Sequence, residues 1–444
     1  MVAFQKGAGL VLFLAQFSGV QSMNLDNRDG ILKASKALAS DLITFYNGNE
    51  SGHTPGLLSP EREKGNDGYW WYQSGAFMGS YVDYWQLTGD KTYNELVTEG
   101  IQWQVGQKKD FMPANQTASL GNDDQSIWAL SALTAAEYGF PNPPEKQPQW
   151  LDLAVTVWEE QRERWDTEVK KDTCDGGLRW QIMSFNNGFD YKQTFANALF
   201  FNIGARLARM TSNETYADYA AKTWDWLEEQ EFINNKTWAV FDGASAAGNC
   251  TDINKVQFSA NPASLAMGAA FMYNFTKGSD KWRQRTEGIT SATLKTFFTK
   301  DGNFKEVSCG KAKCPRGTIM YKGFVHRWLA VSTQVAPFTA SAILPVLRKS
   351  AQGLKAGSNG DDDSMEQKFS NFLVVSNLLI ANSSAPGLHN ETKAEKTKDD
   401  PASTSGSDAK ASSTDAAGNS AIKLAGSGSF LTFSMLVMAF QWVL

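Results

Sequence analysis

The sequence predicts an all-α protein, specifically an (α/α)6 barrel in which six helical hairpins form an inner ring of helices within an outer ring. Apolar residues recur at helical spacing in about twelve segments, and none shows a convincing strand alternation. Segments with one polar face alternate with segments that are apolar nearly all round. A similar short connection between helices recurs along the chain. Its copies are separated by roughly 60 residues, the length of one helical hairpin, or by twice that length.

The predicted helices cover the chain from residue 26 to residue 380. They span residues 26–46, 68–88, 90–106, 122–138, 147–165, 190–211, 213–231, 255–276, 278–299, 320–335, 337–352 and 364–380. Tyr216, Trp224 and Leu227 recur at helical spacing opposite charged residues, so their helix is expected to show one face to water. Segments 190–211 and 260–275 carry apolar or small residues on nearly every side, which is typical of buried helices.

The recurring joints are residues 87–93, 210–216 and 275–282. Each ends a buried helix at a threonine, caps the following exposed helix and then supplies a Tyr or Trp to anchor that helix. An open helical solenoid is the alternative architecture. The period is longer than in the common helical repeats, which favours the closed barrel.

The two ends of the chain predict export and anchoring. Residues 1–22 have the charge at Lys6, the short apolar core and the small residues before Met23 that define a secretory signal peptide. Residues 23–385 are the predicted catalytic domain, and residues 386–418 a disordered Ser/Thr-rich linker, since 392–420 lacks every large apolar residue.

Residues 419–444 predict a signal for attachment of a glycosylphosphatidylinositol (GPI) anchor, which is removed on anchoring. Small residues at 418–421 are followed by a spacer and by the apolar tail 430–444. Asn419 or Gly418 is the expected attachment site. The tail is shorter than the roughly 20 residues of a spanning helix, so a plain C-terminal membrane helix is the less favoured alternative.

Composition narrows the class of protein. A formal net charge of −5 argues against nucleic acid as a partner, and a monomer is expected. Three scattered histidines and the absence of CxxC spacings predict no metal site and no cofactor. Four cysteines suit an oxidising compartment; Cys309 and Cys314 bracket a tight loop and are expected to pair, which leaves Cys174 with Cys250. Eight glycosylation sequons fit a secreted protein: Asn49, Asn115, Asn213, Asn235, Asn249, Asn274, Asn382 and Asn390.

Two consecutive carboxylates, Asp123 and Asp124, begin a predicted inner helix after Gly121. Consecutive residues place two carboxyl groups about 5 Å apart, which is close to the roughly 5–5.5 Å separation in retaining glycosidases. The alternative interpretation is helix capping, in which acids face the positive end of the helix dipole. Loops that lead into inner helices line one mouth of such a barrel, so the pair is expected at that mouth.

Other predicted inner-helix starts bring aromatic and polar residues to the same mouth. Trp70 and Trp71 point about 100° apart on a helix, so one of them is expected to face the cleft. Arg179 is more simply interpreted as part of a structural ion pair, and Asp242 as a turn residue before Gly243. Aromatic rings, carboxylates and amides around one cleft suit a sugar.

These residues together resemble glycoside hydrolase family 76. The resemblance runs from about residue 25 to 380 and depends on four motifs. The motifs are Trp70-Trp71 with Asp83-Tyr84-Trp85, Gly121-Asn122-Asp123-Asp124-Gln125, Gly176-Gly177-Leu178-Arg179-Trp180-Gln181-Ile182 and Met272-Tyr273-Asn274. Within the family, the fungal GPI-anchored cell-wall branch is the more similar one.

The resemblance implies an (α/α)6 barrel and retaining chemistry at α-1,6-mannosyl linkages, with Asp123 as nucleophile and Asp124 as acid/base. It implies a mannan or GPI-core glycan as donor, wall glucan as a candidate acceptor, and a location at the outer face of the plasma membrane or in the wall. The candidate substrate-binding residues are Trp70, Trp71, Asn122, Gln125, Arg179, Trp180, Asn197, Asp242 and Asn261. Ala260, Pro262 and Ala198 depart from the family pattern and bear on the subsites.

Two other classes remain as alternatives. A terpene-cyclase-like helical protein would need a DDxxD motif, but the stretch from Asp123 to Ile127 lacks the third acid. A non-catalytic mannan-binding wall protein would share the cleft and its aromatic residues.

Overall fold

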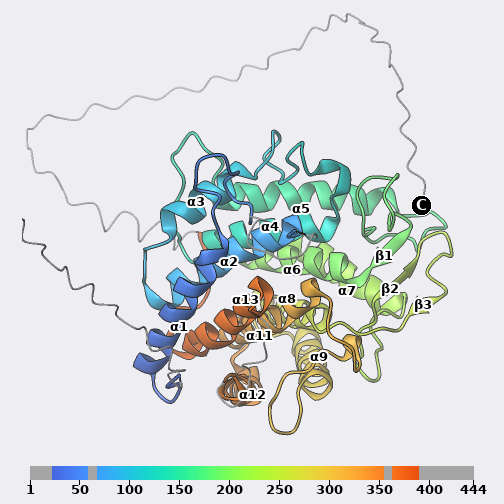
Figure 1. The fold of residues 1–444 in the computed structure, drawn as a ribbon. Coiled ribbons are helices and arrows are strands. Elements are labelled where there is room, and N and C mark those ends of the chain that lie inside the picture. Colours follow the sequence, from blue (N-terminus) through green and yellow to red (C-terminus); the bar gives the residue numbers. More distant parts are fainter. Residues whose placement is uncertain (1–22, 59–67, 355–362, 390–444) are drawn as a thin grey trace, which may run out of the picture. The chain divides into compact units, whose positions relative to one another are not determined.

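The computed structural model describes residues 23–58, 68–354 and 363–389 (Figure 1). The predicted signal peptide, nearly all of the linker, the GPI signal and Asn390 lie outside these residues. All twelve predicted helices are present, and their ends lie within five residues of the expected positions. The largest difference is at segment 255–276, where the helix begins at Ala260.

Six helices that contact one another in succession form the inner ring. They are α2 (Trp71–Thr88), α4 (Asn122–Glu137), α6 (Thr194–Thr211), α8 (Ala260–Phe275), α11 (Tyr321–Val335) and α13 (Met365–Ser376). Each packs against the next, and α13 packs against α2, so the described part of the chain closes on itself. These helices are buried on nearly all sides, as their small and apolar sequences predict.

The outer helices each pack on an inner helix. They are α1 (Arg28–Leu42), α3 (Asn94–Trp103), α5 (Trp150–Thr167), α7 (Glu214–Glu229), α9 (Asp280–Phe297) and α12 (Ala340–Gly353). Helix α1 packs on α13, and the other five follow their inner partners in sequence. The (α/α)6 barrel is therefore confirmed, with its sixth hairpin made from the two ends of the domain (Figure 1).

The recurring joints share one hydrogen bond. Thr88, Thr211 and Thr276 each donate their hydroxyl to the backbone carbonyl four residues earlier, at the end of an inner helix. Asn213 then caps α7, accepting from the N–H of Thr215. Tyr216 packs on Trp158, with ring centroids 4.6 Å apart, and this anchors α7 to its neighbour.

Short elements complete the described chain. They are helix α10 (Arg316–Ile319), the 3-10 helices η1 (Ile43–Phe45), η3 (Thr117–Ser119), η4 (Val307–Cys309), η5 (Pro337–Thr339) and η6 (Asn377–Asn382), and the strands β1 (Tyr191–Gln193), β2 (Gly243–Ser245) and β3 (Ile253–Asn254). The strands form a small antiparallel sheet in the order β1-β2-β3. The sequence shows no strand alternation here because elements of two or three residues are too short to produce an alternating pattern.

Most of the aromatic residues in the described part of the chain are in the core. Nine of the fourteen tryptophans described are buried, so these rings mainly fill the space between the helices. Trp128 on α4 stacks between Trp71 and Phe111, with ring centroids 5.1 and 5.7 Å away. At the far end of α4, Glu137 forms a buried ion pair with Arg206 of α6 at 2.7 Å. In the described residues no helix is long and apolar enough to cross a membrane.

Candidate active site

The two aspartates lie in the first turn of helix α4, which begins at Asn122. Both side chains are half-buried. Asp123 accepts a hydrogen bond from the N–H of Asp124 at 3.0 Å, and Asp124 accepts one from the N–H of Gly121 at 2.8 Å. Asp124 is thus a capping residue, but the capping bond engages only its Oδ2 atom. Among the described residues no hydrogen-bond donor contacts Oδ1, which stays available for proton transfer.

Gly121 holds the two carboxylates close together. A Cβ at this position would lie 2.3 Å from Oδ1 of Asp123 and 3.1 Å from Oδ2 of Asp124. These two oxygens therefore lie no farther apart than the upper end of the roughly 5–5.5 Å that separates the carboxyl groups of retaining glycosidases. The backbone of Gly121 is extended, with φ −90°, so the requirement for glycine here is steric.

Burial changes the charge state of the pair. Burial raises the pKa of Asp124 to about 6, and the hydrogen bond from the N–H of Gly121, which lowers this pKa, offsets only part of the effect. Burial also raises the pKa of Asp123, and the neighbouring charge of Asp124 raises it further. Two carboxylates this close do not both ionise readily, so the pair keeps one proton at mildly acidic pH. The N–H of Asp124 and the indole of Trp180 favour the anion on Asp123, and the N–H of Gly121 favours the anion on Asp124, so the two coupled carboxyl groups share the one proton.

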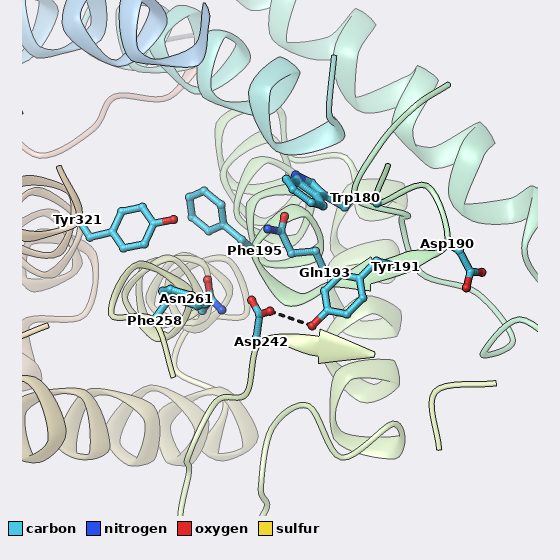
Figure 2. Close-up of a pocket in the computed structure, with 10 residues that line it drawn as sticks. Trp180, Asp190, Tyr191, Gln193, Phe195, Asp242, Phe258, Asn261 and Tyr321 are labelled. Atoms are coloured by element: carbon cyan, nitrogen blue, oxygen red, sulfur yellow. Dashed lines mark hydrogen bonds between the residues drawn. The ribbon is translucent and has the colours of Figure 1, made fainter. Parts of the chain in front are cut away.

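A cavity of about 560 Å³ adjoins the pair, within the usual size range of ligand sites. Its lining residues are Trp180, Gly188, Asp190, Tyr191, Gln193, Phe195, Asp242, Phe258, Asn261 and Tyr321. Figure 2 shows most of these side chains around a common space, with Asp190 directed away from it. Asp123 and Asp124 are not lining residues themselves; Trp180 and Tyr321 connect them with the cavity.

Two lining side chains have polar atoms without a partner. Nδ2 of Asn261, a residue only 2 % exposed, and Oε1 of Gln193 are buried with no hydrogen bond among the described residues. Asp242, by contrast, accepts from the hydroxyl of Tyr191 at 2.8 Å and from Asn254 (Figure 2). An unpaired amide donor and an unpaired amide acceptor in one cavity suit a ligand that carries hydroxyl groups.

The loop that carries Trp180 is fixed to helix α4. The backbone N–H of Asn122 donates to the carbonyl of Trp180 at 2.8 Å, and the Asn122 side chain donates to the carbonyl of Arg179. The disulfide Cys174–Cys250 ties this loop to the segment between β2 and β3. The structure also pairs Cys309 with Cys314.

A buried charge cluster supports the same loop. Lys192, fully buried, donates to the carbonyl of Gly177 and lies 3.1 Å from Glu168. Glu168 also accepts two hydrogen bonds from Arg179. Burial raises the pKa of Glu168, but the bonds from Arg179 and the charge of Lys192 outweigh it and lower that pKa to about 2. Glu168 is therefore ionised at neutral and mildly acidic pH.

Five predicted substrate-binding residues do not line the cavity. Trp71 packs on Trp128, and Gln125 and Asn197 are fully buried in hydrogen bonds to the protein. Asn122 bridges Arg164 and the backbone of Arg179, and Arg179 forms the ion pair with Glu168. Their side chains make contacts within the protein that support the site, and direct sugar contact by these five residues stays a prediction. Trp180, Asp242 and Asn261 do line the cavity.

Trp70 is a separate case. It is 69 % exposed at the position before α2 and is not a lining residue of the cavity. The sequence analysis also left Tyr72 and Tyr321 out of the candidate site residues. Tyr72 is the second residue of α2, and Tyr321 is the first residue of α11. Burial raises the pKa of both phenols, and the negative charge of Asp123 raises both further, so they stay neutral beside the pair. The signal in the sequence that could have identified them is an aromatic residue at the start of a predicted inner helix.

The predicted glycosylation sites are all at the surface where they can be examined. Seven of the eight sequon asparagines lie in the described residues, and each is exposed. Asn249 and Asn274 also make side-chain hydrogen bonds to the protein, to Cys174 and to Arg209 and Val335. Within the described residues no group of His, Cys, Asp and Glu side chains is placed to hold a metal ion.

A helical barrel with two adjoining carboxylates beside a polar, aromatic cavity defines a glycoside hydrolase. The chain matches Glycosyl hydrolase family 76 over residues 30–385, and it belongs to that family. It is 39 % identical over 355 residues to the mannan endo-1,6-alpha-mannosidase DCW1 of Saccharomyces cerevisiae, which covers 80 % of this chain and 76 % of that protein.

Solved structures agree with this family and fold. Dfg5 from Chaetomium thermophilum, in complex with glucosamine, is 45 % identical, with a TM-score of 0.78 over 83 % of this chain and 95 % of that one. An inactive variant of the α-1,6-mannanase GH76A of Salegentibacter sp. HEL1_6, in complex with α-1,6-mannotriose, has a TM-score of 0.62 at 14 % identity, over 79 % of this chain and 99 % of that one. The second likeness concerns the fold alone.

Proposed function

We propose that this chain is a retaining glycosidase or transglycosidase that acts on α-1,6-mannosyl linkages of mannan or of a GPI-core glycan. The observation that carries the proposal is the short separation of the Asp123 and Asp124 oxygens at the start of α4. The names of the fungal relatives, mannan endo-1,6-alpha-mannosidases, support the linkage. In the inactive Salegentibacter variant two consecutive aspartates are replaced by asparagine, which is consistent with a catalytic aspartate pair.

In the first step, an Asp123 oxygen attacks the anomeric carbon and forms a glycosyl ester. The bond from that carbon to the glycosidic oxygen breaks, and Asp124 donates its proton to the departing oxygen. The hydrogen bond from Gly121 fixes Oδ2 of Asp124, so Oδ1 is the atom that carries this proton. Burial and the charge of Asp123 raise the pKa of Tyr72 and Tyr321, so both phenols stay neutral near the pair.

In the second step, the Asp124 carboxylate takes a proton from the hydroxyl of the acceptor. The acceptor oxygen then attacks the anomeric carbon, the ester bond to Asp123 breaks, and the configuration at the anomeric carbon is retained overall. Water as acceptor gives hydrolysis, and a sugar hydroxyl gives transfer. Wall glucan is the proposed sugar acceptor.

A donor that includes an amino sugar fits the charge of the cavity. Asp242 is a carboxylate that lines the cavity, and among the described residues no lysine or arginine lines it. A protonated amino group is attracted to such a site. The glucosamine in the Chaetomium Dfg5 structure supports this choice, and with it the GPI-core glycan as donor.

The ends of the chain support a location outside the cell. The proposed signal peptide 1–22 would direct export, and the linker 386–418 would separate the barrel from a GPI anchor at Asn419. The mature protein would then work as a monomer at the outer face of the plasma membrane or in the cell wall.

Incubation of the purified protein with a labelled mannosyl donor, with and without glucan, tests the function. Labelled mannose bonded to glucan supports transfer, and labelled free sugar supports hydrolysis. The Asp123→Asn and Asp124→Asn variants are expected to lose most turnover while staying folded. A non-catalytic mannan-binding protein is the alternative; binding of the donor without cleavage or transfer at any pH from 4 to 7 would establish it instead.

A further inference from the structure

A second groove lies between helix α3 and the segment that joins α4 to α5. It has a volume of about 590 Å³ and shares no lining residue with the catalytic cavity. Its lining residues are Asn94, Glu95, Thr98, Glu99, Gln102, Trp103, Pro141, Asn142, Pro144 and Gln147. We call it the α3 groove.

One wall of the α3 groove is a stripe of helix α3. Glu95, Glu99 and Trp103 follow one another at four-residue spacing, so they lie on one face, while Val97 and Ile101 on the other face are buried in the core. Trp103 is 61 % exposed, and no ring or cation of the described residues stacks on it. Its indole face is therefore open to a ligand.

The opposite wall is held rigidly. The indole N–H of Trp150 donates to the carbonyl of Pro141 at 3.0 Å, and the Gln149 amide donates to three carbonyls of the same segment. Gln102 of α3 donates to the carbonyl of Pro148 at 2.9 Å, which ties the two walls together. A groove fixed in this way loses little conformational entropy when a ligand binds.

The chemistry of the groove selects one class of ligand. An indole face and two proline rings, Pro141 and Pro144, suit the apolar face of a pyranose ring, and the amides around them suit its hydroxyl groups. Glu95 and Glu99 repel phosphate, nucleic acid and anionic lipid, and none of the lysines and arginines that the structure describes lines the groove.

We propose that the α3 groove is a non-catalytic binding site for a neutral hexopyranose chain, with Trp103 as its stacking residue. The site holds the enzyme on an insoluble polysaccharide while the catalytic cavity works on a separate glycan. None of the seven described sequon asparagines lines the groove, so no N-glycan of the enzyme starts within it. The proposal does not depend on the roles of Asp123 and Asp124.

The test uses the purified protein with Asp123→Asn to prevent turnover, and measures its retention on insoluble α-mannan and, separately, on insoluble β-glucan. The two arms identify the polysaccharide. Trp103→Ala is expected to weaken retention about tenfold on the polysaccharide that binds, the effect of losing one aromatic stacking contact. Trp103→Phe keeps a stacking face and should restore most of it. Lys146→Ala changes an exposed side chain of the same segment outside the lining and should have no effect.

With Asp123 intact, Trp103→Ala should leave kcat/KM on a short soluble donor unchanged, and its melting temperature should match that of the parent. Equal retention of Trp103→Ala and its parent on both polysaccharides would overturn the proposal. A loss of kcat/KM on the short donor would also overturn it, because the residue would then serve the catalytic cavity. A change from dimer to monomer in sedimentation would show that the groove binds a second copy of the chain instead.

Discussion

The Gly121→Ala substitution tests the geometry of the catalytic pair with one added methyl group. The new Cβ would lie 2.3 Å from Oδ1 of Asp123, whereas real Cβ contacts stay beyond 3.0 Å. The Asp123 carboxylate must therefore move by at least the difference, about 0.7 Å. The backbone itself accepts alanine, because Gly121 is extended, with φ −90° and ψ 160°.

A displacement of about 1 Å at a reacting group costs on the order of 100-fold in rate, so a movement of this size predicts a loss of roughly 10- to 100-fold in kcat/KM. The assay is turnover of an α-1,6-mannosyl oligosaccharide, with the melting temperature measured in parallel. Gly248→Ala is the matched control, because a Cβ there meets its nearest neighbours at the ordinary distances of 3.7–4.0 Å. Wild-type kcat/KM in a folded Gly121→Ala protein would refute the assignment of Asp123 as a reacting group.

Three further predictions concern charge and cross-links. Burial raises the pKa of Asp124 to about 6, and the first step needs its proton, so kcat/KM should fall about tenfold per pH unit above pH 6; a plateau to pH 8 would exclude Asp124 as the acid. Glu137→Gln leaves Arg206 buried without its charge partner and should lower the free energy of unfolding by about 3–5 kcal/mol in urea denaturation; a loss under 1 kcal/mol would show that the pair is dispensable. Replacing Cys174 and Cys250 by serine removes a disulfide that links residues 76 positions apart in the sequence. This should lower the free energy of unfolding by about 4 kcal/mol and abolish much of the activity. The same change at Cys309 and Cys314, only 5 residues apart, should cost less, and equal losses would contradict the loop-closure argument.

The helical barrel could be predicted from the sequence because its two rings leave different patterns. Inner helices such as α6 and α8 have no polar face, whereas α7 keeps one, and the Thr joints mark where one type gives way to the other. The pairing of α1 with α13 could not be read locally, since the two helices are more than 300 residues apart. Strand β1 was missed because its three residues lead directly into the apolar pattern of α6.

The candidate aspartate pair and three lining residues, Trp180, Asp242 and Asn261, could be picked out from the sequence, but most of the lining of the cavity could not. Asn197 and Asn261 carry the same amide at the start of inner helices. Only three-dimensional packing shows that Asn197 bonds to Leu178 and Gln193, while Asn261 has an unpaired Nδ2 in the cavity. Phe258 and Tyr321 reach the same cavity from distant segments, and no local pattern indicates that they meet.

Mass spectrometry of the covalent glycosyl-enzyme tests the double displacement most directly. A donor with a good leaving group, such as α-mannosyl fluoride, given to the Asp124→Ala variant should allow the first step and slow the second. The account predicts one added hexosyl group on the peptide that contains Asp123, and products that keep the donor's anomeric configuration. A hexosyl group on any other residue, or products with the inverted configuration, would contradict it.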